Sequence, residues 1–86
     1  MRNNSKTLKT RKLVLIEWID SKGLTSEWEF WEDINPLLPS TCMSIGFLIE
    51  ETKEYTTIAQ NISETQVLGR MTIPTRSILQ MKNLKQ

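Results

Sequence analysis

A short stretch of strict alternation in the middle of the chain constrains the fold more than any other feature. From residue 43 to residue 50, one set of alternate positions is entirely apolar: Met43, Ile45, Phe47 and Ile49. The other set consists of Ser44, Gly46, Leu48 and Glu50. Successive side chains of a strand point to opposite faces of the sheet, so a period of two predicts a strand with one buried face. We expect the apolar set to form that face.

Four further segments have a strand-like composition: residues 12–20, 55–62, 67–73 and 77–84. They are dense in the aliphatic, β-branched and aromatic residues that are favoured in strands. The charged residues 51–54 form a turn, which makes a hairpin of the second and third predicted strands. Pro74 ends the fourth strand because proline has no amide proton to donate.

Between residues 24 and 41 the alternation disappears, and aromatic and proline residues are crowded together: Trp28, Phe30, Trp31, Pro36 and Pro39. This composition predicts a long, ordered, aromatic loop. Ser26 and Glu29 have the spacing of a capping box, which predicts a helical turn through residues 31–34. Pro36 then ends that turn.

Five short strands, a long loop after the first strand and tight hairpins predict a mostly β fold, a small five-stranded SH3-like barrel. An OB-like barrel is the main alternative, but it usually has a fuller helix between its third and fourth strands. A chain of 86 residues has room for one core. We expect a single domain at residues 13–86, preceded by a basic, flexible arm at residues 1–12. The thin core favours a homo-oligomer.

The residues that catalysis and metal binding usually need are missing. The chain has no His and a single Cys, Cys42, which excludes triads, structural zinc sites and internal disulfides. Gly23, Gly46 and Gly69 are too scattered for a phosphate-binding loop and indicate one turn and two places where a strand bends or admits a neighbour. Acids cluster at residues 27–33 without a spacing that singles out a catalytic pair. We expect no enzyme, no metal site and no cofactor.

Charge and hydropathy indicate the environment and the partners. Residues 1–12 hold five Lys or Arg and no acid, but they lack the apolar core of a signal peptide. No stretch approaches the roughly twenty apolar residues of a membrane span, and a lone cysteine fits a reducing compartment. We therefore expect a cytoplasmic protein without a membrane partner. From residue 13 onward, six Lys or Arg stand against ten acids, which argues against nucleic-acid binding by the domain.

Tryptophan is dense in this chain and marks the candidate binding site. Three tryptophans fall within residues 18–31, and Trp offers a large, rigid contact area with one polar group. Two of them could instead plug the open end of the barrel. An indole could stack on a base while an arginine holds a phosphate. The candidate ligand-binding residues are Trp18, Asp20, Trp28, Trp31, Tyr55, Arg70 and Arg76.

Several motifs carry a resemblance to a known group: W-I-D at residues 18–20, Trp28, C-M-S-I-G-F-L-I-E-E-T at 42–52, E-Y-T-T-I-A-Q-N at 54–61, and V-L-G-R-M-T-I-P at 67–74 with Ile78. With these, residues 13–84 resemble short uncharacterised proteins encoded by bacteriophages and prophages. The resemblance implies a viral origin, a small β-barrel and a place in the cytoplasm of the infected bacterial host. Many compact phage proteins without catalytic residues act against host immunity, so it also makes a counter-defence role a candidate.

Three functions follow as hypotheses. The leading one is an oligomeric phage protein that acts as a sponge for a small nucleotide-like signalling molecule of host immunity. The second is an interaction module that inhibits a host protein through the aromatic and acidic loop. The third is nucleic-acid binding through the basic arm at residues 1–12.

Overall fold

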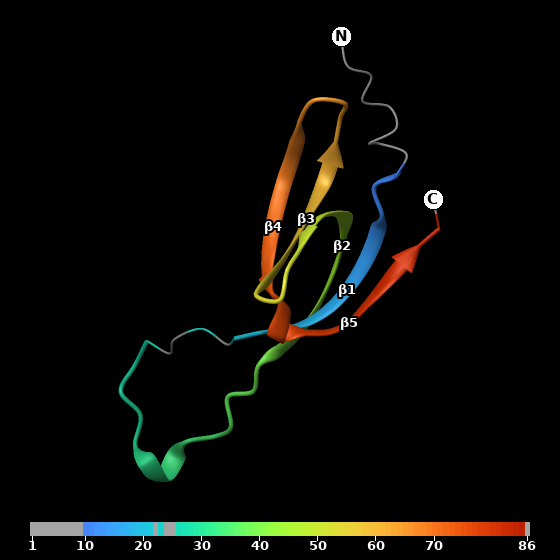
Figure 1. Ribbon diagram of the computed structural model, residues 1–86. Helices are drawn as coiled ribbons and strands as arrows, with labels where there is room; N and C mark the ends of the chain where they lie inside the picture. The colour runs from blue at the N-terminus through green and yellow to red at the C-terminus, as the bar shows by residue number, and fades with distance from the viewer. Residues whose placement is uncertain (1–9, 22, 24–25, 86) are drawn as a thin grey trace.

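The computed structural model describes residues 10–21, 23 and 26–85, so most of the predicted basic arm lies outside the described residues. Five strands and two short 3-10 turns follow in order (Figure 1): β1 (Leu13–Asp20), η1 (Trp31–Asp33), β2 (Ser40–Glu51), β3 (Tyr55–Ile62), β4 (Val67–Pro74), η2 (Thr75–Ser77) and β5 (Ile78–Leu84). The five predicted strands are confirmed, with boundaries that shift by at most three residues.

The strands form one antiparallel sheet in the order β4-β3-β2-β1-β5. Consecutive strands are neighbours until η2, after which the chain returns to pair β5 with β1. The mostly β, five-stranded fold is therefore confirmed. The sheet is not closed, because β4 and β5 are its two ends and do not pair with each other. A closed SH3-like barrel is not confirmed.

The core lies on the face of the sheet that curves inward. Its buried cluster consists of Val14 and Ile16 from β1, Ile58 from β3 and Ile73 from β4, each at most 2% exposed. The partly buried side chains that pack against this cluster are Trp18, Leu48, Ile78 and Met81. Residues from the first, third and fourth strands meet because the sheet bends.

The orientation of β2 differs from the sequence prediction. Its register places Ser44 opposite Ile16 and Gly46 opposite Val14, so these two small residues face the core together with Leu48. The apolar set faces outward, where Met43 is 65% and Ile45 56% exposed. The prediction that this apolar set forms the buried face was wrong.

The reason lies in what the inward face has to accommodate. The Trp18 indole Nε1 donates a 3.0 Å hydrogen bond to Ser44 Oγ, so a polar side chain is needed at that position. Ser44 Oγ in turn lies 3.8 Å from Met71 Sδ of β4, across β3. Only small residues of β2 leave room for this approach between strands that are not neighbours.

Threonines hold the return of the chain from β4 to β5. Thr75 Oγ1 donates to the carbonyl of Thr52 over 2.8 Å and lies 3.1 Å from Thr56 Oγ1. The Thr75 amide donates to the carbonyl of Glu54 over 3.0 Å. These bonds tie η2 to the turn between β2 and β3, and they direct β5 back toward β1.

We predict that Gly46→Ala destabilises the protein by about 1–3 kcal/mol, the usual range for an overpacked site. A Cβ at Gly46 would lie 2.9 Å from the carbonyl oxygen of Ala59 and 3.1 Å from the Ile58 Cβ, so backbone would have to move. Urea unfolding monitored by circular dichroism measures the change. Gly23→Ala is the matched control, because a Cβ there meets no atom within 4 Å. Equal midpoints for the two variants would contradict the prediction.

Candidate functional site

The segment between β1 and β2 projects away from the sheet and carries the candidate site (Figure 1). The radius of gyration is 17.7 Å, and the longest extent of the chain is 66 Å. A compact domain of this length has a radius of gyration of about 12 Å. The predicted long aromatic loop is present, but it extends outward with Trp28 and Trp31 exposed and does not plug an end of the sheet (Figure 1).

Large apolar side chains of this projecting loop, residues 26–39, are exposed. They are Trp28 at 103%, Phe30 at 74%, Trp31 at 90%, Ile34 at 50%, Leu37 at 56% and Leu38 at 71%. Exposed single apolar residues are ordinary, but six large apolar side chains exposed within residues 26–39 make this loop the candidate interaction surface. The structure therefore places Trp28 and Trp31 where a partner can reach them.

The tip of the projecting loop is ordered by the turn η1. The amide of Asp33 donates to the carbonyl of Phe30 over 2.9 Å, and the amide of Ile34 donates to that of Trp31 over 3.4 Å. This is the predicted helical turn, in the tighter 3-10 form. The predicted capping box is wrong, because Phe30 is the N-cap residue and no side chain caps the turn. Ser26 stands four residues before that N-cap position.

Acidic residues surround the exposed indoles. Glu27, Glu29, Glu32 and Asp33 lie in the projecting loop, which contains no Lys or Arg. A hollow of about 410 Å³ is lined by Ser26, Glu27, Trp28, Glu29, Trp31 and Ile34. Carboxylates without a neighbouring cation repel a phosphate. The hollow suits an apolar or cationic group better than an anion.

Trp18 is separate from the projecting loop. It lies in β1, packs against the core cluster and donates its indole proton to Ser44. Its position indicates a structural role in the core. Asp20, the last residue of β1, pairs with Ser40 at the base of the projecting loop.

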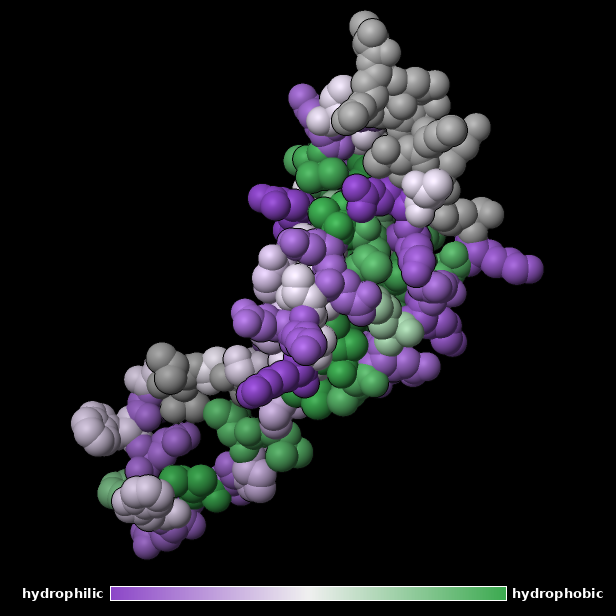
Figure 2. All heavy atoms as spheres, viewed as in Figure 1, coloured by the Kyte–Doolittle hydropathy of each residue, from purple (hydrophilic) through white to green (hydrophobic). Residues whose placement is uncertain are grey.

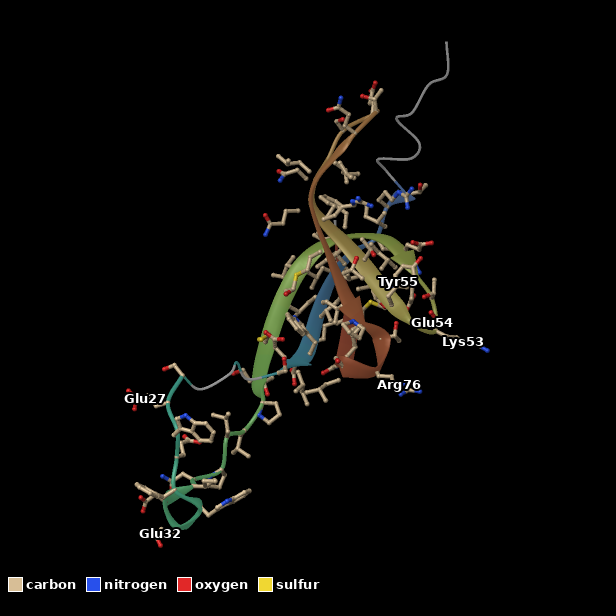
Figure 3. The ribbon with its side chains drawn as sticks, turned by 90° about the vertical axis from the view of Figure 1, so that its left-hand side faces the viewer. Glu27, Glu32, Lys53, Glu54, Tyr55 and Arg76 are labelled. Atoms are coloured by element: carbon tan, nitrogen blue, oxygen red, sulfur yellow. The ribbon has the colours of Figure 1, made fainter. Side chains whose placement is uncertain are left out.

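The two candidate arginines lie on other elements. Arg70 is in β4 opposite Ala59, and Arg76 is in η2. Figure 3 shows Arg76 near Lys53, Glu54 and Tyr55, far from Glu27 and Glu32 of the projecting loop. Within one chain, the structure does not bring the arginines to the exposed tryptophans.

Tyr55 begins β3 and contacts an acid of the same hairpin. Its hydroxyl donates a 2.9 Å hydrogen bond to Glu50 Oε1. This hydrogen bond and the negative charge of Glu50 raise the pKa of the Tyr55 phenol above the ordinary value of 10.0. Tyr55 is the only tyrosine of the chain, so its ionisation can be observed directly.

We predict that Glu50→Gln lowers the pKa of Tyr55 toward 10.0, as measured by the near-ultraviolet absorbance of the phenolate. The raised pKa of the folded state also has a consequence for stability. The contribution of protonated Tyr55 to the free energy of unfolding is fully present below the tyrosine pKa of the unfolded chain. It is lost as the pH rises through the pKa of Tyr55 in the folded state. Glu51→Gln is the control, and a pKa lowered equally in both variants would show that the Glu50 contact is not the cause.

The remaining surface offers no metal site among the described residues, which contain no group of three or more His, Cys, Asp or Glu placed to hold an ion. Cys42 is a free, half-buried thiol on the inward side of β2. Across the described segments, no helix is long and apolar enough to cross a membrane.

Sequence reasoning found Trp28 and Trp31 but not the rest of the apolar group. Ile34, Leu37 and Leu38 join these tryptophans on the surface, and none of the three was a predicted site residue. Their sequence signal was weak: they are apolar residues beside Pro36 in a segment without a strand or helix period, which predicts a loop but does not fix their exposure.

Comparison with models of known protein families, with curated proteins and with solved structures finds no match to this chain. The site therefore has to be interpreted from its own geometry.

Proposed function

We propose that this chain is a binding protein whose projecting loop engages a partner protein, with Trp28 and Trp31 as the anchoring side chains. The observation that carries the proposal is the almost complete exposure of both indoles, 103% and 90%, on a loop extended away from its own sheet. Tryptophan is among the residues that contribute most to binding at protein interfaces. The resemblance to phage proteins makes a host protein the expected kind of partner.

The chemistry of the loop defines the surface that it fits. Apolar anchors flanked by four acids are complementary to an apolar pocket with Lys or Arg at its rim. The acids would chiefly accelerate association and exclude acidic surfaces, while burial of the indoles would supply most of the affinity. Binding should therefore slow as salt concentration rises.

Sequestration of a nucleotide-like signal, as a counter-defence activity, is a separate proposal with a stricter requirement. It needs a cation beside the indoles, and Arg70 and Arg76 lie elsewhere in the same chain. An arginine from a second copy would have to complete the site.

The SH3-like barrel likewise stays a proposal, which the inward bend of the sheet between Ser44 and Met71 supports.

We predict that Trp28→Ala abolishes capture of a stoichiometric partner from host lysate, with at least a tenfold loss of affinity for the purified partner. Truncation of an interface anchor typically costs 2 kcal/mol or more, and about 1.4 kcal/mol corresponds to tenfold. Biolayer interferometry with the purified partner gives the affinity. Because Trp28 makes no core contact, its variant should unfold at the same urea concentration as the wild type.

Leu68→Ala is the matched control, because Leu68 is 71% exposed but lies on β4 and outside the loop. Equal binding by the wild type and by Trp28→Ala would refute the loop as the binding element. Thermal stabilisation by cyclic dinucleotides, lost in Trp28→Ala and in Arg70→Ala, would instead favour the nucleotide proposal.

A further inference from the structure

The outward face of β1 and β2 forms a second apolar surface, distinct from the projecting loop. Met43 is 65%, Ile45 56% and Ile19 37% exposed there. The register adds Leu15 opposite Ile45 and Leu13 opposite Phe47 on the same face. In Figure 2, hydrophobic residues are visible over the strands and along the loop.

The polarity of β2 indicates that this face is covered. A strand with one face in water normally places its polar residues outward and its apolar residues inward. In β2 the outward positions Met43, Ile45 and Phe47 are apolar, whereas the inward positions are Ser44, Gly46 and Leu48, of which only Leu48 is a large apolar residue. This pattern suits a strand whose outward face is also buried, between its own core and another layer.

The exposed area leaves room for such a layer. The chain exposes 7597 Å², whereas a compact monomer of the same mass exposes about 5,200 Å². Each subunit of an obligate homodimer buries about 1,000 Å² or more. This larger area includes the projecting loop, and the exposed apolar side chains of β1 and β2 are also part of it.

The charges on this face are self-complementary. Glu17 of β1 pairs with Gln80, and Leu15 pairs with Lys82 of β5, so Glu17 and Lys82 are diagonal neighbours on one face. Leu15, Glu17, Met43, Gln80 and Lys82 line a hollow of about 100 Å³. In a dimer with two-fold symmetry, this patch of one copy packs against the same patch of the other copy in the opposite direction. Glu17 of one copy can then face Lys82 of the other, around an apolar centre.

We propose that a second copy of this chain covers the outward face of β1 and β2, giving a symmetric dimer of two stacked sheets with Ile45 and Met43 at its centre. The sheets pack about 10 Å apart, as in a β-sandwich. The dimer leaves both projecting loops free, so it is independent of the function proposed for them. It would present two loops to partners from one assembly.

Sedimentation equilibrium of the full chain tests the proposal. The wild type is expected to sediment as a dimer. Ile45→Glu is expected to raise the dimer dissociation constant by roughly a hundredfold or more, because it would bury an unpaired carboxylate at the interface. Leu68→Glu, at a position on β4 that is 71% exposed against 56% for Ile45, should leave the dimer intact. Circular dichroism of both variants establishes that the monomer remains folded.

A charge exchange provides a second measurement that does not depend on the apolar positions. Glu17→Lys and Lys82→Glu should each weaken the dimer by placing like charges opposite one another, and the double variant should restore it. A monomeric wild type, or variants without effect on sedimentation, would overturn the proposal. Dissociation by Trp28→Ala to the same extent as by Ile45→Glu would also overturn it, because the loop of a neighbour would then occupy the face. Loss of partner binding with an intact dimer would bear only on the loop.

Discussion

The fold depends on the limited space above the inward face of one bent sheet. Val14, Ile16, Ile58 and Ile73 are the only members of the buried cluster among the described residues, and the partly buried Trp18 packs against it. A cluster of this size can form only if β2 approaches closely, which requires the small residues Ser44 and Gly46 on its inward side. The hydrogen bond from Trp18 to Ser44 brings β2 close to the cluster and at the same time needs a small polar side chain at position 44.

This constraint explains why the apolar residues of β2 face outward. Because adjacent residues of a strand alternate between faces, small inward residues leave Met43 and Ile45 on the outside. A small core also contributes little stability, so further burial by association would benefit the fold. The proposed dimer face is thus a direct consequence of how the core is built.

The projecting loop has a different physical origin. Its tryptophans make no contribution to the core cluster, and its apolar residues lie among acids and prolines that do not continue a strand. Residues that do not stabilise their own fold, yet are large and apolar, are best explained by a partner. We therefore propose two different contacts for the two apolar surfaces, one with a second copy and one with another protein.

The strands and the loop could be predicted from local patterns. Three such patterns are the period of two in residues 43–50, the proline at position 74 and the aromatic cluster after Asp20. Each affects the backbone through neighbouring residues, so no knowledge of the tertiary structure was needed to interpret it. The candidate site was predictable only in part. Trp28 and Trp31 are exposed, which is one of the two placements that the sequence left open, whereas Trp18 packs against the core and Arg70 and Arg76 lie on other elements.

The strands and the loop were easier to predict than the site, because strands and turns depend on residues close in the sequence, whereas the site depends on contacts between distant residues. The sequence by itself determined that β2 is a strand with two unlike faces and that the chain has one thin core. It did not determine which face turns inward, because alternation is symmetric with respect to the two sides of a sheet. The tertiary structure decided this through contacts between distant residues, above all Trp18 with Ser44 and Ser44 with Met71. Those contacts need small side chains inside, and they leave the apolar face of β2 outside.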